Sequence, residues 1–153
     1  MTKLQSRGSS LESYYLYFQT LSKFHDPKLL RRTLDYAISP AVRSQDTLGM
    51  IAAVMRNPAG AKLAWDFVRM HWPEIEKVGG GFTSAEVVAA TGVFCDAEMH
   101  EQVRSFFAQH DVPTAERTLK LSLESIHNCT DLKSQQTPEL STWLQQKGSA
   151  SGK

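Results

Sequence analysis

The 153-residue chain lacks several features that would place it in a broad class at once. It has no apolar run near the roughly 18 residues needed to cross a bilayer, so we expect no membrane span. Its formal net charge is only +1, which argues against a nucleic-acid partner. Its start, residues 1–10, is polar and is not typical of a signal peptide. The hydrophobic content of 41% suits one soluble globular domain that buries its own core.

Cysteine is scarce, and the two residues present, Cys95 and Cys129, have no Cys-x-x-Cys spacing. Isolated cysteines are common in protein cores as reduced thiols, and this is the state we expect here. A single disulfide is the alternative, and it would require an oxidising compartment.

Motifs for catalysis are also missing. There is no Gly-x-Ser-x-Gly elbow and no phosphate-binding loop. His100-Glu101 begins like the zinc-protease motif His-Glu-x-x-His, but Arg104 stands where the second histidine is needed. We therefore expect His100 and Glu101 to lie on a solvated helix face. The chain supplies no candidate catalytic, metal-ligating or cofactor-binding residue, and we expect no cofactor in it.

The aromatic residues and the remaining histidines have simple structural interpretations. Trp65, Trp72 and Trp143 lie on or at the end of amphipathic segments, where core packing is expected and the ring N–H needs a partner. His71 and His110 end apolar segments and would complement the negative end of a helix.

Proline placement marks the starts of helices or helical turns along the chain. Four of the six prolines follow a residue that is favoured as an N-cap, and proline itself is favoured at the next position. These pairs are Asp26-Pro27, Ser39-Pro40, Asn57-Pro58 and Thr137-Pro138, and Ser84, Asp96 and Thr114 are further candidate caps. Breaks are expected at Pro73, at Gly79-Gly80-Gly81, which resembles a flexible link, and at Asp111-Val112-Pro113.

Apolar residues recur at helical spacing between these signals, and no stretch predicts a convincing strand. The segment Thr47–Met55 carries no charge, which favours a helix buried on most sides. Between residues 61 and 72, the charged residues Lys62, Asp66 and Arg69 form one narrow stripe in which neighbours can pair.

The pattern predicts an all-α fold, a HEAT/armadillo-like helical superhelix of about eight helices, because pairs of such helices have the size of one repeat. A compact helical bundle is the alternative. We expect a disordered N-terminal segment at 1–8, a single helical domain at 9–146 and a flexible tail at 147–153.

An ordered set of short segments carries a resemblance to a known family. The segments are Leu34–Pro40, Val42–Asp46, Asn57–Gly60, Leu63–Val68 with Trp72, Gly79–Phe82, Val103–Phe107, Pro113–Thr118 and Leu140–Leu144. Together they resemble the C-terminal domain of the puromycin-sensitive and endoplasmic-reticulum aminopeptidases, which belong to the zinc aminopeptidase family of aminopeptidase N. One departure is that Asn128 is followed by Cys129-Thr130-Asp131-Leu132, where many relatives have a tryptophan.

The resemblance implies a parent enzyme whose catalytic domain binds zinc through two histidines and a glutamate. None of those motifs occurs in this chain, so the zinc is expected in the parent's catalytic domain. The resemblance also implies that this helical domain walls the substrate chamber and acts without its own catalysis. Its expected partners are that catalytic domain and peptide substrates. The alternative function is an autonomous α-solenoid module for protein–protein interaction.

Three residues near one predicted helix start are candidates for chamber or interdomain contacts: Arg43, Gln45 and Asp46. Charges on a concave face would bias which peptides are held there. The competing interpretation is structural, because an aspartate near a helix N-terminus complements the dipole and Arg43 can bond local carbonyls.

Overall fold

The computed structural model describes residues 11–150, and these form helices without any strand. The seven α-helices are α1 (Leu11–Thr20), α2 (Pro27–Ala37), α3 (Ser44–Arg56), α4 (Ala61–Met70), α5 (Trp72–Ala90), α6 (Ala97–Gln109) and α7 (Glu116–Ala150). Three 3-10 helices join them: η1 (Leu21–Lys23), η2 (Thr91–Val93) and η3 (Pro113–Ala115). The all-α prediction is confirmed, while the predicted disordered segment at 1–8 lies outside the described residues.

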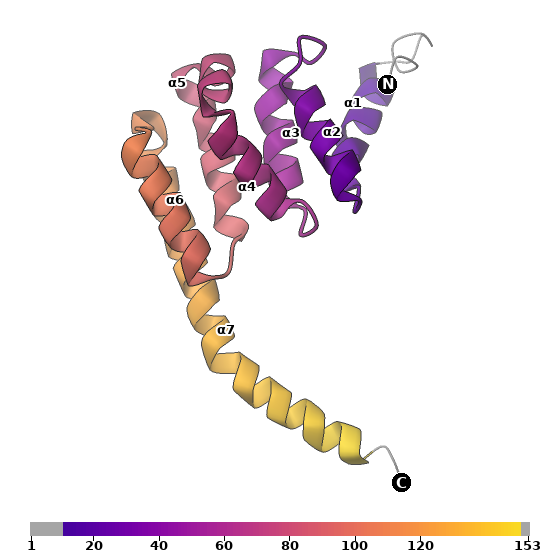
Figure 1. Ribbon diagram of the computed structural model, residues 1–153, viewed down its shortest axis with the longest axis vertical. Helices are drawn as coiled ribbons and strands as arrows, with labels where there is room; N and C mark the ends of the chain where they lie inside the picture. The colour runs from indigo at the N-terminus through magenta and orange to yellow at the C-terminus, as the bar shows by residue number, and fades with distance from the viewer. Residues whose placement is uncertain (1–10, 151–153) are drawn as a thin grey trace.

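The helices stack side by side in chain order (Figure 1). Helix α3 packs against α5 and α5 packs against α7, whereas α2 packs against α4. Consecutive helices therefore alternate between two layers, and each helix touches mainly its neighbours. Helical repeat proteins bury their apolar faces in this way.

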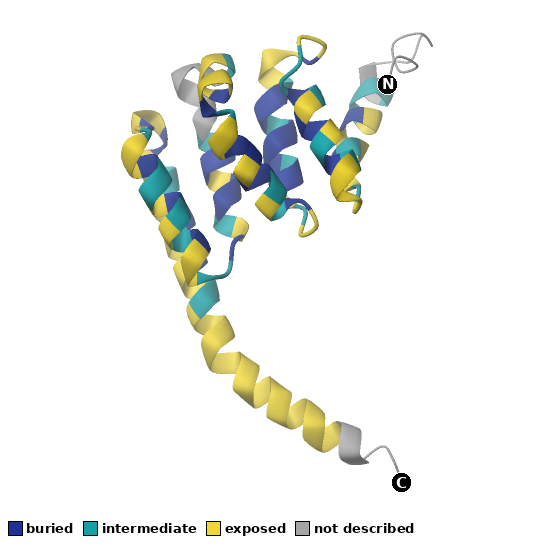
Figure 2. Ribbon diagram, viewed as in Figure 1, coloured by how far each residue is buried: buried dark blue, intermediate teal, exposed yellow. Residues whose placement is uncertain are grey.

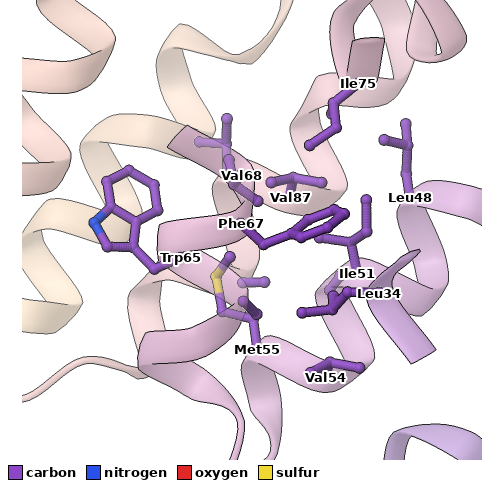
Figure 3. Close-up of a cluster of buried hydrophobic side chains, with 14 of the residues drawn as sticks. Leu34, Leu48, Ile51, Val54, Met55, Trp65, Phe67, Val68, Ile75 and Val87 are labelled. Atoms are coloured by element: carbon purple, nitrogen blue, oxygen red, sulfur yellow. The ribbon is translucent and has the colours of Figure 1, made fainter. Parts of the chain in front are cut away.

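The core lies where α2, α3, α4 and α5 meet (Figures 2 and 3). Ile51 and Met55 from α3 meet Phe67 from α4 and Val87 from α5, and all four are fully buried. The uncharged segment Thr47–Met55 is buried along most of α3, as predicted. Full burial of such a side chain contributes about 1.5–3 kcal/mol, so α3 and α4 hold the domain together.

The predicted caps are confirmed at two helices, and two further cap–proline pairs begin turns. The Asp26 carboxylate accepts a hydrogen bond from the Lys28 N–H at 2.8 Å, and Asp96 accepts one from the Met99 N–H at 2.8 Å. Ser39-Pro40 and Asn57-Pro58 begin turns, which agrees with the predicted start of a helix or helical turn, and α3 and α4 follow from Ser44 and Ala61.

Two expected interruptions of α5 are wrong. The helix runs without a break from Trp72 to Ala90, so Gly79-Gly80-Gly81 is not a link and Ser84 does not cap a new helix. A glycine costs about 1 kcal/mol in a helix. Both ends of α5 are anchored by fully buried side chains, Ile75 before the glycines and Val87 after them, and their packing keeps the helix continuous.

Helix α7 extends far beyond the core as an exposed arm (Figures 1 and 2). Thr137-Pro138 does not start a helix, because Pro138 lies inside α7, where proline is tolerated at the cost of a bend. Residues 131–147 are all exposed, so the prediction that Trp143 packs in the core is wrong. The helix continues to Ala150. The division into a domain at 9–146 and a flexible tail at 147–153 stays a prediction.

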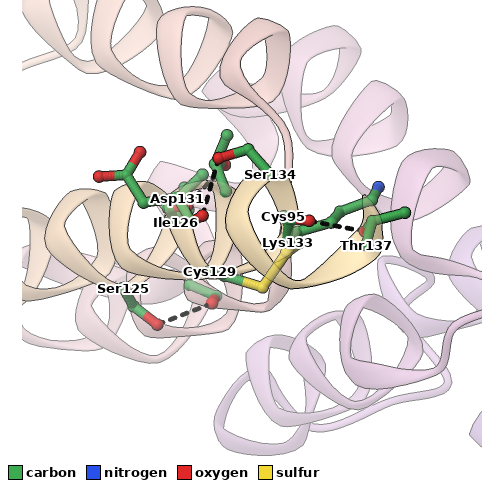
Figure 4. Close-up of a disulfide and its surroundings, with 10 residues drawn as sticks. Cys95, Ser125, Ile126, Cys129, Asp131, Lys133, Ser134 and Thr137 are labelled. Atoms are coloured by element: carbon green, nitrogen blue, oxygen red, sulfur yellow. Dashed lines mark hydrogen bonds between the residues drawn. A yellow bond between two sulfur atoms is a disulfide. The ribbon is translucent and has the colours of Figure 1, made fainter. Parts of the chain in front are cut away.

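A disulfide joins Cys95 to Cys129, so the prediction of two reduced thiols is wrong (Figure 4). Cys95 lies between η2 and α6, and α7 returns past this segment because it packs against both η2 and α6. The two Cα atoms are therefore 5.1 Å apart despite a separation of 34 residues, which is within the range that a disulfide spans.

Candidate functional site

One face of the molecule, built from α1, α3 and α5, carries a hollow of about 360 Å³. Its walls come from α1 and η1 on one side and from Glu86 of α5 on the other, and α3 forms its floor. On this floor, α3 presents the small residues Gly49 and Ala53, which leave room for the hollow. A Cβ atom added to Gly49 would lie 3.6 Å from the nearest carboxylate oxygen of Glu86, so this carboxylate lies directly over the glycine.

The structure brings two of the three predicted contact residues to this hollow. Gln45 and Asp46 line it, whereas Arg43 precedes α3 as an exposed N-cap residue and does not. The Tyr15 hydroxyl donates a hydrogen bond to Asp46 Oδ2 at 3.5 Å, which links α1 to α3. Asp46 also lies in the first turn of α3, where a negative charge complements the dipole. A contact with a chamber or another domain stays a prediction for all three residues.

The charge of Asp46 contributes to the pKa of a neighbouring tyrosine, Tyr14. Burial raises the pKa of Tyr14, with further contributions from Tyr36 and from Asp46, while Arg43 acts in the opposite direction. The carboxylate at this end of the hollow therefore acts on groups beyond its hydrogen-bond partner.

A second hollow, of about 490 Å³, adjoins the first and shares Lys23 and Ala53 with it. His25 and Arg56 line this second hollow. The Asn57 side-chain amide fixes it by donating hydrogen bonds to the Ser22 carbonyl at 2.8 Å and to the Phe24 carbonyl at 2.7 Å. The segment that bears Lys23 and His25 is thereby held against the end of α3.

Sequence reasoning missed Glu86, Lys23, His25 and Arg56 as parts of one surface. They come from three separate segments, and only the packing of η1 and α5 against α3 brings them together. One signal was available, because Gly49 interrupts an otherwise well-packed apolar helix at a position where a glycine indicates a close approach.

Elsewhere on the described residues, no three histidine, cysteine, aspartate or glutamate side chains gather to hold a metal ion. Glu101 is exposed and pairs with Arg104 at 2.7 Å, as expected for a solvated helix face. Hydrogen bonds from Arg104 and Ser105 lower the pKa of Glu101 to about 2. The Trp65 ring N–H donates to Gln102 Oε1 at 3.2 Å, which confirms the expected partner for a buried indole.

The arm of α7 presents a second exposed surface, which we call the arm stripe. It consists of the exposed apolar residues Leu132, Leu140, Trp143 and Leu144. The last three follow the i, i+3, i+4 spacing of one helix face. Within residues 11–150, no helix combines the length and apolar character needed to cross a membrane.

The stacked helices define an all-α domain that carries two adjoining hollows on one face. A family model described as the ERAP1-like C-terminal domain matches residues 3–128. The chain belongs to this family, the C-terminal domain of aminopeptidases.

Curated relatives agree with this assignment. The chain is 31% identical to Aminopeptidase M1 of Arabidopsis thaliana over 110 residues, 71% of this chain and 12% of that protein. It is 30% identical to Aminopeptidase N of Mus musculus, covering 81% of this chain and 14% of that protein. It is 27% identical to Endoplasmic reticulum aminopeptidase 2 of Homo sapiens, covering 91% of this chain and 15% of that protein. The matched region thus spans about one seventh of the length of these relatives or less.

Proposed function

We propose that this chain is the non-catalytic C-terminal domain of a zinc metallo-aminopeptidase. In this role it walls the substrate chamber and supports removal of N-terminal residues from peptides by the parent's catalytic domain. The observation that carries the proposal is the family match over residues 3–128, combined with a coverage of only 12–15% of these three relatives. The zinc would be held by the parent's catalytic domain, with no ligand from this chain.

Two surfaces support the proposed partners. The paired hollows over α3 would face peptide substrates, because they combine a small-residue floor with charged walls. The arm stripe would contact the catalytic domain. Helix α7 is exposed over residues 131–147 and contains an internal proline, so this stretch has little stability of its own in water and a partner surface would stabilise it.

A mixing experiment tests this function. The parent's catalytic portion is assayed on an amino-acyl fluorogenic substrate and on peptides of graded length, with and without this chain. We expect the chain to bind the catalytic portion and to change the rate or the length preference, because closure around substrate alters both binding and turnover.

Matched variants make the test specific to the arm stripe. The double substitution Leu140→Glu and Trp143→Glu should abolish association, because it introduces two charges into an apolar contact. Met70→Glu, at an equally exposed apolar residue on α4, should leave association unchanged. If the wild-type chain neither binds the catalytic portion nor changes its activity, the chain is better described as an autonomous interaction module.

A further inference from the structure

The paired hollows over α3 carry opposite charges at their two ends. We propose that they bind an extended peptide segment with a basic side chain at one end and a carboxylate about four residues away at the other. This inference deepens the proposed function and rests on it for the identity of the ligand as a peptide.

Helix α3 sets the spacing of the charged residues in this site. Asp46, Gly49, Ala53 and Arg56 follow one another at intervals of three, four and three residues, so they form one stripe along a single helix face. The middle of the stripe has almost no side chain, whereas its two ends are charged. A peptide backbone can therefore approach the helix closely at Ala53, between Arg56 and the Glu86 carboxylate that lies over Gly49.

Each end of the stripe is reinforced from another element. At the acidic end, Glu86 of α5 places its carboxylate over Gly49, so two carboxylates line the same hollow. At the basic end, His25 joins Arg56, and Lys23 lies at the junction, where it lines both hollows. Within the described part of the chain, none of these five charged or titratable side chains forms an ion pair, although Asp46 accepts a hydrogen bond from the Tyr15 hydroxyl. No opposite charge of the described residues therefore neutralises them.

The spacing of the charges follows from helix geometry. Ten residues separate Asp46 from Arg56, which is about 15 Å along the helix axis. An extended chain advances about 3.3 Å per residue, so the same distance corresponds to about four or five residues of a bound peptide. A cation and a carboxylate on adjacent residues match the separation of Asp46 and Arg56 less well than a pair four residues apart.

The first test measures binding of fluorescent nine-residue peptides to this chain by anisotropy at low salt. The matched peptide carries one lysine and one aspartate four residues apart in a Ser/Ala background, with both termini blocked. The comparison peptide has the same composition with the two charges adjacent. We expect the matched peptide to bind at least about tenfold more tightly, because only this peptide satisfies both charged ends.

Variants assign the effect to the site. Glu86→Gln and Arg56→Gln should each remove most of the preference, whereas Glu124→Gln and Arg117→Gln, at exposed residues of α7, should retain it. Ala53→Leu changes no charge but fills the junction of the two hollows, so it should weaken the matched peptide. Ala89→Leu, at an exposed position of α5, is its control. Glu86→Lys should shift the preference toward a peptide with two carboxylates.

The source of the carboxylate is tested separately. A peptide whose aspartate is replaced by a free C-terminus at the same distance from the lysine either binds equally well, which identifies a carboxylate as the recognised group, or binds weakly, which restricts the site to acidic side chains. Both outcomes support the proposal.

Equal binding of the matched and comparison peptides would overturn it, as would equal effects of Glu86→Gln and Glu124→Gln. If that happens while the chain still binds the catalytic portion, the charge-spaced site is wrong and the proposed function stands. If the chain also fails to bind the catalytic portion, both are wrong.

Discussion

Removing the disulfide should cost a large part of the stability of the domain. The bond links the segment before α6 to α7 and closes a loop of 34 residues. The chain-entropy relation for such a loop gives about 3.8 kcal/mol at 25 °C, because the unfolded chain gains that much freedom when the bond is absent. For a domain of this size, that corresponds to a fall of about 8–15 °C in Tm.

Contacts next to the disulfide determine whether α7 keeps its position when the bond is removed. One turn before Cys129, Ile126 is fully buried, and the Ser122 hydroxyl donates to the Val88 carbonyl at 3.0 Å. The Ser125 hydroxyl donates to the Gly92 carbonyl at 3.1 Å. These contacts keep α7 in place without the bond, so the Cys95→Ala and Cys129→Ala double variant should fold with the same helix content and lower stability.

Urea unfolding followed by circular dichroism measures the effect. Oxidised wild type should be about 3–4 kcal/mol more stable than both the reduced wild type and the double variant, and those two should agree with each other. Ser125→Ala is a control that removes one exposed hydrogen bond and should cost less than about 1 kcal/mol. The reasoning would be refuted if the urea midpoint of the wild type were the same with and without reductant, and if its two thiols reacted with a thiol reagent before unfolding.

Other substitutions test the packing and the charges. Gly60→Ala should destabilise the domain by about 1–3 kcal/mol in the same urea assay, since its Cβ would lie 2.7 Å from the Val54 carbonyl oxygen. Gly49→Ala has room for the Cβ and should stabilise the domain by up to about 1 kcal/mol, because alanine has the higher helix propensity. Asn57→Asp should cost about 2–4 kcal/mol by turning a carboxylate toward two carbonyls, and Asn57→Ala should cost less. Because the pKa of Glu101 is lowered to about 2, its contribution to stability is present above its ordinary value of 4.5 and is lost as pH falls toward 2. Glu101→Gln should lack this pH dependence, and an NMR titration of Glu101 with a midpoint near 4.5 would contradict the assignment.

Local signals in the sequence predicted much of the helical framework. Asp26 and Asp96 cap the helices they were expected to cap, and the uncharged segment of α3 is buried. These features depend on a few neighbouring residues and on helical periodicity, both of which are visible in one sequence.

The errors arose where a helix continues through a residue that disfavours it, or where distant packing brings two segments together. The glycines at 79–81 and Pro138 are helix breakers by propensity, yet both lie inside long helices. The pairing of Cys95 with Cys129 depends on the return of α7 past η2, which no local pattern reports.

The candidate site could be predicted only in part for the same reason. Gln45 and Asp46 lie on the helix that forms the floor, so they were found near the start of α3. Glu86 and Lys23 reach the same surface from other elements, and their positions follow from tertiary packing alone.

The length of α7 beyond the core amplifies small movements at its base. From Ile126, its last fully buried residue, the helix runs 24 residues to Ala150, which is about 36 Å of helix axis. A rotation of about 5° at the base would therefore move the far end by about 3 Å. The Cys95–Cys129 bond lies near the base of the exposed part of α7. A shift of α6 relative to the core would therefore be transmitted through this bond to the position of the arm stripe.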